Sequence, residues 1–313
     1  MEGIYPSLYA YGAVLLLYLF GLIANITLIY TIYVNKKFHT PSYILSVSMA
    51  ISDMMLMISS GLFTILSIIQ NTGSPIDSLS YFVICQCNSL SFVSSYTVSA
   101  LSFMTISIDR YFTINLQPNS KSLLIKPFIL YTVIISIWLI GISTSIPVVL
   151  MVKPIQNSNN ICSLENFRDT NLALLLAHIF NIIITFPIPL TTICVLYYRI
   201  TQKLKSLPVP LNHCSNGIGS SNRRRIQATK MMMIATISFV INTSILYTVS
   251  IVLGSLDPFA VATLFQSPTG ILSALTITSL LTASETIQNP ILFYCYNKTF
   301  RQAVLSIRCC RKI

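Results

Sequence analysis

Long apolar runs separated by short polar segments recur along the whole chain. A helix that crosses a lipid bilayer needs about 20 consecutive, mostly apolar residues. Seven runs reach that length, and few of the segments between them are long. The predicted spans are residues 8–33, 43–70, 83–114, 127–151, 173–200, 226–253 and 267–294. The pattern therefore predicts an all-α membrane protein in which residues 1–313 form a single bundle of seven transmembrane helices.

A different pattern follows the seventh run. Between residues 297 and 308, apolar side chains such as Phe300 and Val304 recur at helical spacing, with basic residues on the other faces. This spacing predicts a short amphipathic helix that lies in the cytoplasmic interface. Cys309 and Cys310 follow it, and a cysteine pair next to the membrane is a candidate for palmitoylation, although two free thiols fit equally well.

Composition supports a membrane location. The chain is 54% hydrophobic and 9% charged, whereas soluble domains are about 25% charged. Its mean hydropathy is +0.74. Too few charges are present to cover a surface that faces water, so the outer surface is expected to face lipid. The net charge of +11 would suggest nucleic acid in a soluble protein, but no basic and aromatic signature for such a partner is present.

The basic residues also predict the orientation. With the N-terminus outside the cell, all of the 19 Lys and Arg residues except Lys153 and Arg168 fall on the cytoplasmic side. Asp109 is then the only cytoplasmic acid. Such a bias follows the positive-inside rule, and a wrong number of spans would destroy it. We therefore expect a multi-pass plasma-membrane protein with an extracellular N-terminus and a cytoplasmic C-terminus.

Two acids fall inside predicted spans: Asp53 lies midway along the second, and Glu285 lies within the seventh. A charge at bilayer depth costs about 2.5–3.5 kcal/mol, so such residues are expected to face the bundle interior and to have a function. For Glu285, a protonated carboxyl bonded to a backbone carbonyl is the alternative. Asp109 and Arg110 adjoin near the end of the third span, where a snorkelling surface pair is also common.

The segment Asp109-Arg110-Tyr111 resembles the Asp-Arg-Tyr motif that closes the third helix of rhodopsin-like, or class A, receptors. Residues typical of that family also fall on the other spans. They are Gly21 and Asn25, Leu45 and Asp53, Trp138, Pro189 and Tyr197, Phe239, and Asn289-Pro290 followed by Phe293. The chain is similar to a divergent, orphan-type member that looks like peptide or chemosensory receptors.

The resemblance implies a G-protein-coupled receptor, not an enzyme, that passes an extracellular signal to a heterotrimeric G protein. Arg110 would contact the G protein. The residues implied in coupling and activation are Asp109, Arg110, Tyr111, Tyr197, Asn289, Pro290 and Tyr294. The resemblance further implies a disulfide between Cys85 and Cys162, which ties the third helix to an outer loop.

The same resemblance implies a ligand pocket in the outer halves of the helices. Its expected residues are Phe92, Tyr96, Asn181, Thr185, Tyr247 and Ser279. All are uncharged, so a biogenic amine is not expected, and Ala283 stands where opsins carry their retinal lysine. We expect a peptide or a small chemosensory molecule instead.

A possible sodium ion is the one cofactor that the resemblance implies. In the family, residues at the positions of Asp53, Ser99 and Asn289 converge on a water and sodium pocket. Glu285 precedes Asn289 by one helical turn and lies on the same face, so we hypothesise that it adds a second acid.

Some features depart from the family pattern. The sixth span carries Asn242-Thr243-Ser244-Ile245 where a Cys-Trp-x-Pro motif is usual, so the tryptophan and the proline kink are both missing. The alternative function is a transporter or channel that uses Asp53 and Glu285, but no internal repeat supports it. Motifs of membrane enzymes are also missing.

Overall fold

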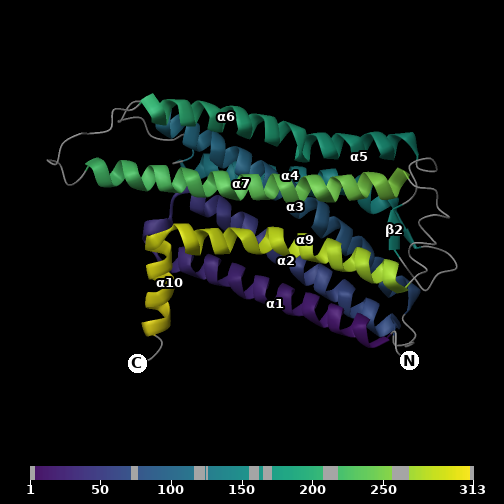
Figure 1. Ribbon diagram of the computed structural model, residues 1–313. Coiled ribbons are helices and arrows are strands. Elements are labelled where there is room, and N and C mark those ends of the chain that lie inside the picture. The colour runs from purple at the N-terminus through teal and green to yellow at the C-terminus, as the bar shows by residue number, and fades with distance from the viewer. Residues whose placement is uncertain are drawn as a thin grey trace.

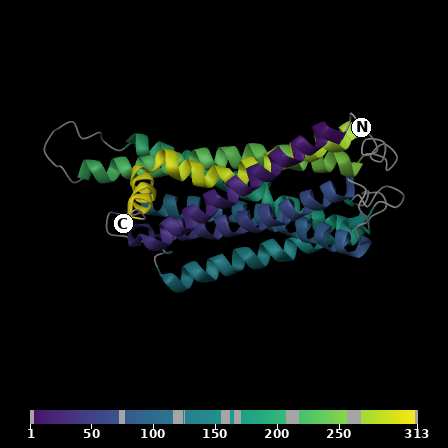
Figure 2. The same ribbon diagram turned by 90° about the horizontal axis from the view of Figure 1, so that it is seen from below.

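The computed structural model is a bundle of long helices that run side by side, with one short helix across an end (Figure 1). It describes residues 4–71, 77–115, 124, 126–154, 162–164, 171–206, 218–255 and 268–310. Helix α1 begins at one end of the bundle and α10 lies at the other, as both views show (Figures 1 and 2). An odd number of crossings places the two ends of a chain in this way.

The helices match the predicted spans closely. They are α1 Ile4–Val34, α2 Pro41–Asn71, α3 Ser78–Asn115, α4 Pro127–Met151, α5 Leu172–Thr185, α6 Pro187–Ser206, α7 Ile218–Ser255, α9 Pro268–Tyr296 and α10 Lys298–Cys310. A 3-10 turn, η1, covers Lys36–Phe38, and strands β1 (Val152–Pro154) and β2 (Cys162–Leu164) pair antiparallel. The sixth span is longer than expected, because α7 begins at Ile218 and not near residue 226.

The fifth predicted span is not one continuous helix. It divides into α5 and α6 around Phe186, whose N–H still donates to the Ile182 carbonyl at 3.0 Å. The next residue, Pro187, has no N–H to donate, and Pro189, two residues later, has none either. Because proline also clashes with the preceding turn, the helix breaks here and resumes at once. The predicted span over residues 173–200 is therefore one apolar segment, Leu172–Lys203, made of two helices.

Polarity in the bundle is inverted relative to a soluble protein. Phe128 is 82% exposed and Leu139 is 61% exposed, whereas Asn25 and Asp53 are fully buried. In the described part of the chain, five segments are long and apolar enough to cross a membrane: Tyr9–Val34, Pro41–Leu66, Leu79–Thr113, Pro127–Met151 and Leu172–Lys203. Apolar faces directed outwards and polar groups directed inwards are what a lipid environment requires.

Polar side chains join the helices inside the bundle. Asn25 on α1 donates from its amide to the Thr286 carbonyl on α9 at 3.0 Å. Trp138 on α4 donates from its indole N–H to the Ser48 hydroxyl on α2 at 2.9 Å. Both residues belong to the motif set that the sequence singled out, so their positions are explained by interhelical bonds that lipid cannot replace.

An aromatic cluster closes the end of the bundle that carries α10. Its members are Phe38, Tyr43, Phe293 and Phe300, with neighbouring ring centroids 5.0–5.7 Å apart. Asn297 sits at the junction: its amide donates to the Tyr43 hydroxyl, and its Oδ1 accepts from the Phe300 N–H. The cluster therefore fixes α10 across the ends of α2 and α9 (Figure 2).

We predict that Trp138 and Ser48 are energetically coupled. A double-mutant cycle of Trp138→Phe and Ser48→Ala should give an interaction energy of about 0.6–1.7 kcal/mol, because the bond lies inside the membrane. The measurement is reversible unfolding of the purified protein in bicelles. Additive effects of the two substitutions would contradict the bond.

Candidate functional site

Two cavities open into the end of the bundle far from α10. The first, here called the central cavity, has a volume of about 150 Å³. It lies between α3, α4, α5 and α7, and is lined by Asn88, Ser89, Phe92, Val93, Tyr96, Val148, His178, Asn181, Thr243, Leu246 and Tyr247. Four of the predicted pocket residues are brought together here: Phe92, Tyr96, Asn181 and Tyr247.

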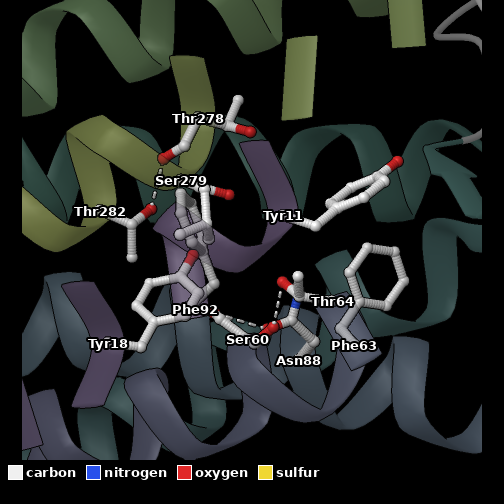
Figure 3. Close-up of a pocket in the computed structure, with 11 residues that line it drawn as sticks. Tyr11, Tyr18, Ser60, Phe63, Thr64, Asn88, Phe92, Thr278, Ser279 and Thr282 are labelled. Atoms are coloured by element: carbon white, nitrogen blue, oxygen red, sulfur yellow. Dashed lines mark hydrogen bonds between the residues drawn. The ribbon is translucent and has the colours of Figure 1, made fainter. Parts of the chain in front are cut away.

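The second cavity, here called the lateral cavity, lies between α1, α2, α3 and α9 and measures about 110 Å³ (Figure 3). Ser279 lines this cavity and not the central one, so the sequence grouped residues that the fold separates. Thr185 is not among the described lining residues of either cavity; its hydroxyl lies 3.2 Å from that of Thr97 and joins α5 to α3.

Sequence reasoning missed most of the lateral cavity. Figure 3 shows its side chains converging from four helices, with Asn88 beside Ser60 and Thr64. These residues form no motif, and tyrosine, serine and threonine are common on the inner faces of all the helices. Only the approach of α1 and α9 to α2 and α3 reveals that they share a cavity.

A buried polar cluster lies deeper in the bundle. Asp53 is 1% exposed and Glu285 is 2% exposed. Asp53 Oδ1 accepts from the Ser95 hydroxyl at 3.4 Å, and the Asn289 side chain is within its reach. The two acids are close enough to interact electrostatically. The structure thus brings together the acids and the amide that the sequence placed in one site.

Several oxygens in this cluster have no hydrogen-bond partner. They are Asp53 Oδ2 and both carboxylate oxygens of Glu285; the hydroxyl of Ser99, on α3, is likewise buried without a partner. Buried polar atoms are nearly always paired, so this group calls for an occupant. Carboxylate and hydroxyl oxygens suit a hard cation such as sodium, so the residues present fit that ion. Across the described residues, no group of three or more His, Cys, Asp or Glu side chains could hold a metal ion.

Tyr96 connects the central cavity to the polar cluster. Its ring packs on Phe92 at 4.8 Å and on Phe239 at 6.3 Å between centroids. Its hydroxyl is buried near Glu285 but is not close and aligned enough to form a hydrogen bond with it. Tyr96 therefore lines the cavity together with Thr243, which stands where the family's tryptophan is usual, and Phe239 packs against the Tyr96 ring.

Arg110 lies at the opposite end of α3. One of its terminal nitrogens donates to the Ser42 hydroxyl on α2 at 2.7 Å, and its Nε is buried without a partner. Asp109 is buried beside it, and the buried Tyr197 on α6 is near enough to interact electrostatically with the guanidinium. The contact between Arg110 and Ser42 was not predicted, because the sequence does not show what a serine at the start of a helix will contact.

Tyr294 is placed differently from expectation. It is 41% exposed on the outside of α9, whereas Phe293 is 3% exposed and packs in the aromatic cluster. Successive helical residues differ in direction, so only one of the two can face inwards. Phe293 does so, and Tyr294 faces outwards. Asn289 and Pro290 are both buried in α9.

The described cysteines agree in part with expectation. Cys85, near the start of α3, is buried and disulfide-bonded. Cys87, Cys194 and Cys295 are free. The predicted partner, Cys162, begins β2, but its side chain lies outside the described part, as do those of Cys309 and Cys310.

Comparison with known proteins agrees with this geometry. The profile of the family described as "7 transmembrane receptor (rhodopsin family)" matches residues 24–293. A "QRFP-like peptide receptor" of Branchiostoma floridae is 23% identical over 95% of this chain and 76% of its own length. The human histamine H2 receptor is 25% identical over 69% of this chain and 57% of its own length.

A solved structure supports the fold. The structure described as "Crystal structure of squid rhodopsin" has a TM-score of 0.75 and 18% identity, and the match covers 95% of this chain and 84% of that one. The profile match alone spans well over half of the chain. The helical bundle and the short helix after the seventh span are thereby confirmed, and a transporter or an enzyme is not favoured. This is a G-protein-coupled receptor with several membrane spans, and the chain belongs to the rhodopsin family of seven-transmembrane receptors.

Proposed function

We propose that this receptor binds an extracellular peptide in its two cavities and that binding releases Arg110, at the other end of α3, to contact a heterotrimeric G protein. The observation that carries the proposal is the arrangement along α3. Phe92 and Tyr96 line the cavities, Ser95 donates to Asp53 in the buried polar cluster, and Arg110 is held by a neutral hydroxyl. One rigid helix thus contacts every part of the site.

The chemistry of the cavities supports a peptide over an amine. Among the described lining residues there is no carboxylate, and His178 is the only ionisable base. Burying an ammonium group there without a counter-charge would be costly. The Branchiostoma relative that matches 95% of the chain is named as a peptide receptor. The human relative named for histamine matches a smaller share of the chain. Phe92, which lines both cavities of this chain, carries no charge that could pair with an amine.

The inner end supports release of Arg110 on activation. A hydrogen bond from a charged group contributes about 1.5–3 kcal/mol, which a change in helix packing can overcome. Arg110 has its Nε unsatisfied, and Tyr197 is nearby. A shift of α6 or α7 that opens this end would let the guanidinium leave Ser42 and meet the G protein.

The proposed orientation places the cavities outside the cell and α10 in the cytoplasm. Disulfides form in oxidising compartments, and Cys85 lies at the cavity end of α3. Strand β1 packs against α3 and pairs with β2, where Cys162 begins the strand. We propose Cys162 as the partner of Cys85. Cys309 and Cys310, which end α10, would then be available for palmitoylation at the inner surface.

A sodium ion is the proposed occupant of the buried polar cluster. Asp53, Ser99, Glu285 and Asn289 would hold it, and the ion would satisfy free oxygens there and offset the charge of one of the two carboxylates. Its charge would favour the helix arrangement in which these four side chains converge. A ligand that favours another arrangement would then oppose the ion, since the two bias one equilibrium.

Replacing Arg110 tests the G-protein contact. Purified receptor in nanodiscs should catalyse some nucleotide exchange on a heterotrimeric G protein even without ligand. Arg110→Ala should abolish that exchange, because the charged contact is lost. Arg199→Ala, an exposed arginine on α6, is the control for general loss of positive charge. Equal exchange by wild type and Arg110→Ala would refute the proposed contact.

Ser42→Ala should have the opposite effect. Removing the hydroxyl takes away the partner that holds Arg110, so ligand-free nucleotide exchange should rise about 2- to 10-fold. Ser46 is the matched control, because it is buried one turn further along α2 and donates only to the Ser42 carbonyl. If Ser46→Ala raises exchange as much as Ser42→Ala, the Arg110 hydrogen bond is not what restrains the receptor.

The sodium proposal predicts an effect on stability that can be measured without a ligand. The unfolding midpoint of the wild type should rise when choline chloride is replaced by sodium chloride at constant ionic strength, because the ion binds only the folded state. Glu285→Gln should weaken this rise and Asp53→Asn should remove it. Ser284→Ala, on the exposed face of the same helix, should leave it unchanged. A sodium effect that persists in both acid variants would rule out the site.

A further inference from the structure

The central and lateral cavities share part of their walls. Asn88 and Phe92 line both of them, and they lie one turn apart on the same face of α3. The cavities therefore open on either side of a short ridge formed by these two side chains. A ligand that fills one cavity must pass this ridge to reach the other.

Each cavity is the size of one side chain. Ligand pockets usually measure about 300–1,000 Å³, and both cavities are smaller than that. A cavity of about 150 Å³ is known to hold a benzene ring, which matches the volume of the central cavity. The lateral cavity, at about 110 Å³, suits a branched aliphatic group. The two together would accept two different groups of one ligand.

Asn88 supplies a directed donor at the ridge. Its Oδ1 accepts from the Ser60 hydroxyl at 2.9 Å and lies 3.4 Å from that of Ser59. The Tyr18 hydroxyl is near enough to Ser60 and Ser279 to interact with both, and Figure 3 shows Ser60 beside Asn88. With the oxygen occupied, the Asn88 amide nitrogen is the part left to face the cavities, where it can donate to a carbonyl.

Extended peptides have the matching geometry. Side chains of successive residues in an extended chain point in opposite directions, and a carbonyl lies between them. We propose that the two cavities form one bipartite site for a neighbouring aromatic and aliphatic residue of an uncharged peptide segment, with Asn88 donating to the carbonyl between them. This deepens the proposed function and rests on it, because it assumes that a ligand binds at this end of the bundle.

Capped dipeptides test the site without knowledge of the natural ligand. The probes are N-acetyl-Leu-Phe-amide and N-acetyl-Phe-Leu-amide, and the readout is a saturable rise in the unfolding midpoint of the full-length receptor in nanodiscs. At least one probe should bind about tenfold more tightly than its analogue with glycine in place of leucine. Absence of saturable binding by either probe would overturn the proposal.

Filling the lateral cavity tests the two halves of the site separately. Ser279→Leu places an aliphatic group in the lateral cavity, so the preference for leucine over glycine in the probe should disappear. Ser284→Leu makes the same change on the exposed face of α9 and should keep the preference. If the two variants behave alike, the lateral cavity does not hold part of the ligand.

Asn88→Asp tests the donor. Aspartate has the same shape and still accepts from Ser60, but it lacks the amide N–H. The capped probes should bind about tenfold more weakly, and the same dipeptide amide with a free amino terminus should bind more tightly than to wild type. Unchanged affinities would exclude Asn88 as the donor. Ligand-free nucleotide exchange needs no peptide, so failure of this site and failure of the Arg110 mechanism are distinguishable.

Discussion

Hydrocarbon offers no hydrogen-bonding partner, and this constraint shapes the whole bundle. Many serine and threonine side chains on the spans donate to a carbonyl one turn earlier, as Thr105 and Ser107 do on α3. Asn25 and Trp138 instead bond across helices. Among the buried polar atoms that remain unpaired, those of the acids Asp53 and Glu285 are the ones that carry carboxylate chemistry, and this is why the proposed ion is placed there.

Between the central cavity and the buried polar cluster there is no tryptophan of the kind that the family usually carries in its sixth span. Tyr96 contributes a large aromatic ring from α3, and Phe239 contributes another from α7. Helix α7 runs unbroken from Ile218 to Ser255, and the proline-induced break lies between α5 and α6 instead. The break thus lies in the fifth span and not in the sixth, and α6, which follows it, carries Tyr197 near Arg110.

The end of the bundle that carries α10 combines a tightly packed aromatic cluster with a single hydrogen bond that holds Arg110. The aromatic cluster and Asn297 tie η1, α2, α9 and α10 together through several ring contacts. Arg110, by contrast, makes one hydrogen bond to the neutral Ser42. A receptor needs two arrangements separated by only a few kcal/mol so that a ligand can shift their populations. A single bond to a neutral partner keeps that difference small while the surrounding frame stays fixed.

The sequence by itself determined the spans, the amphipathic α10 and the family, because apolar run length, charge bias and the motif around Arg110 are local properties. The family resemblance grouped Asp53 with Asn289, and the helical spacing between Glu285 and Asn289 added the second acid to that site. It could not separate Ser279 from Tyr247, foresee Ser42, or choose between Phe293 and Tyr294. Those outcomes depend on how far each helix is rotated and how closely it approaches its neighbours, and the packing of all the helices decides both at once.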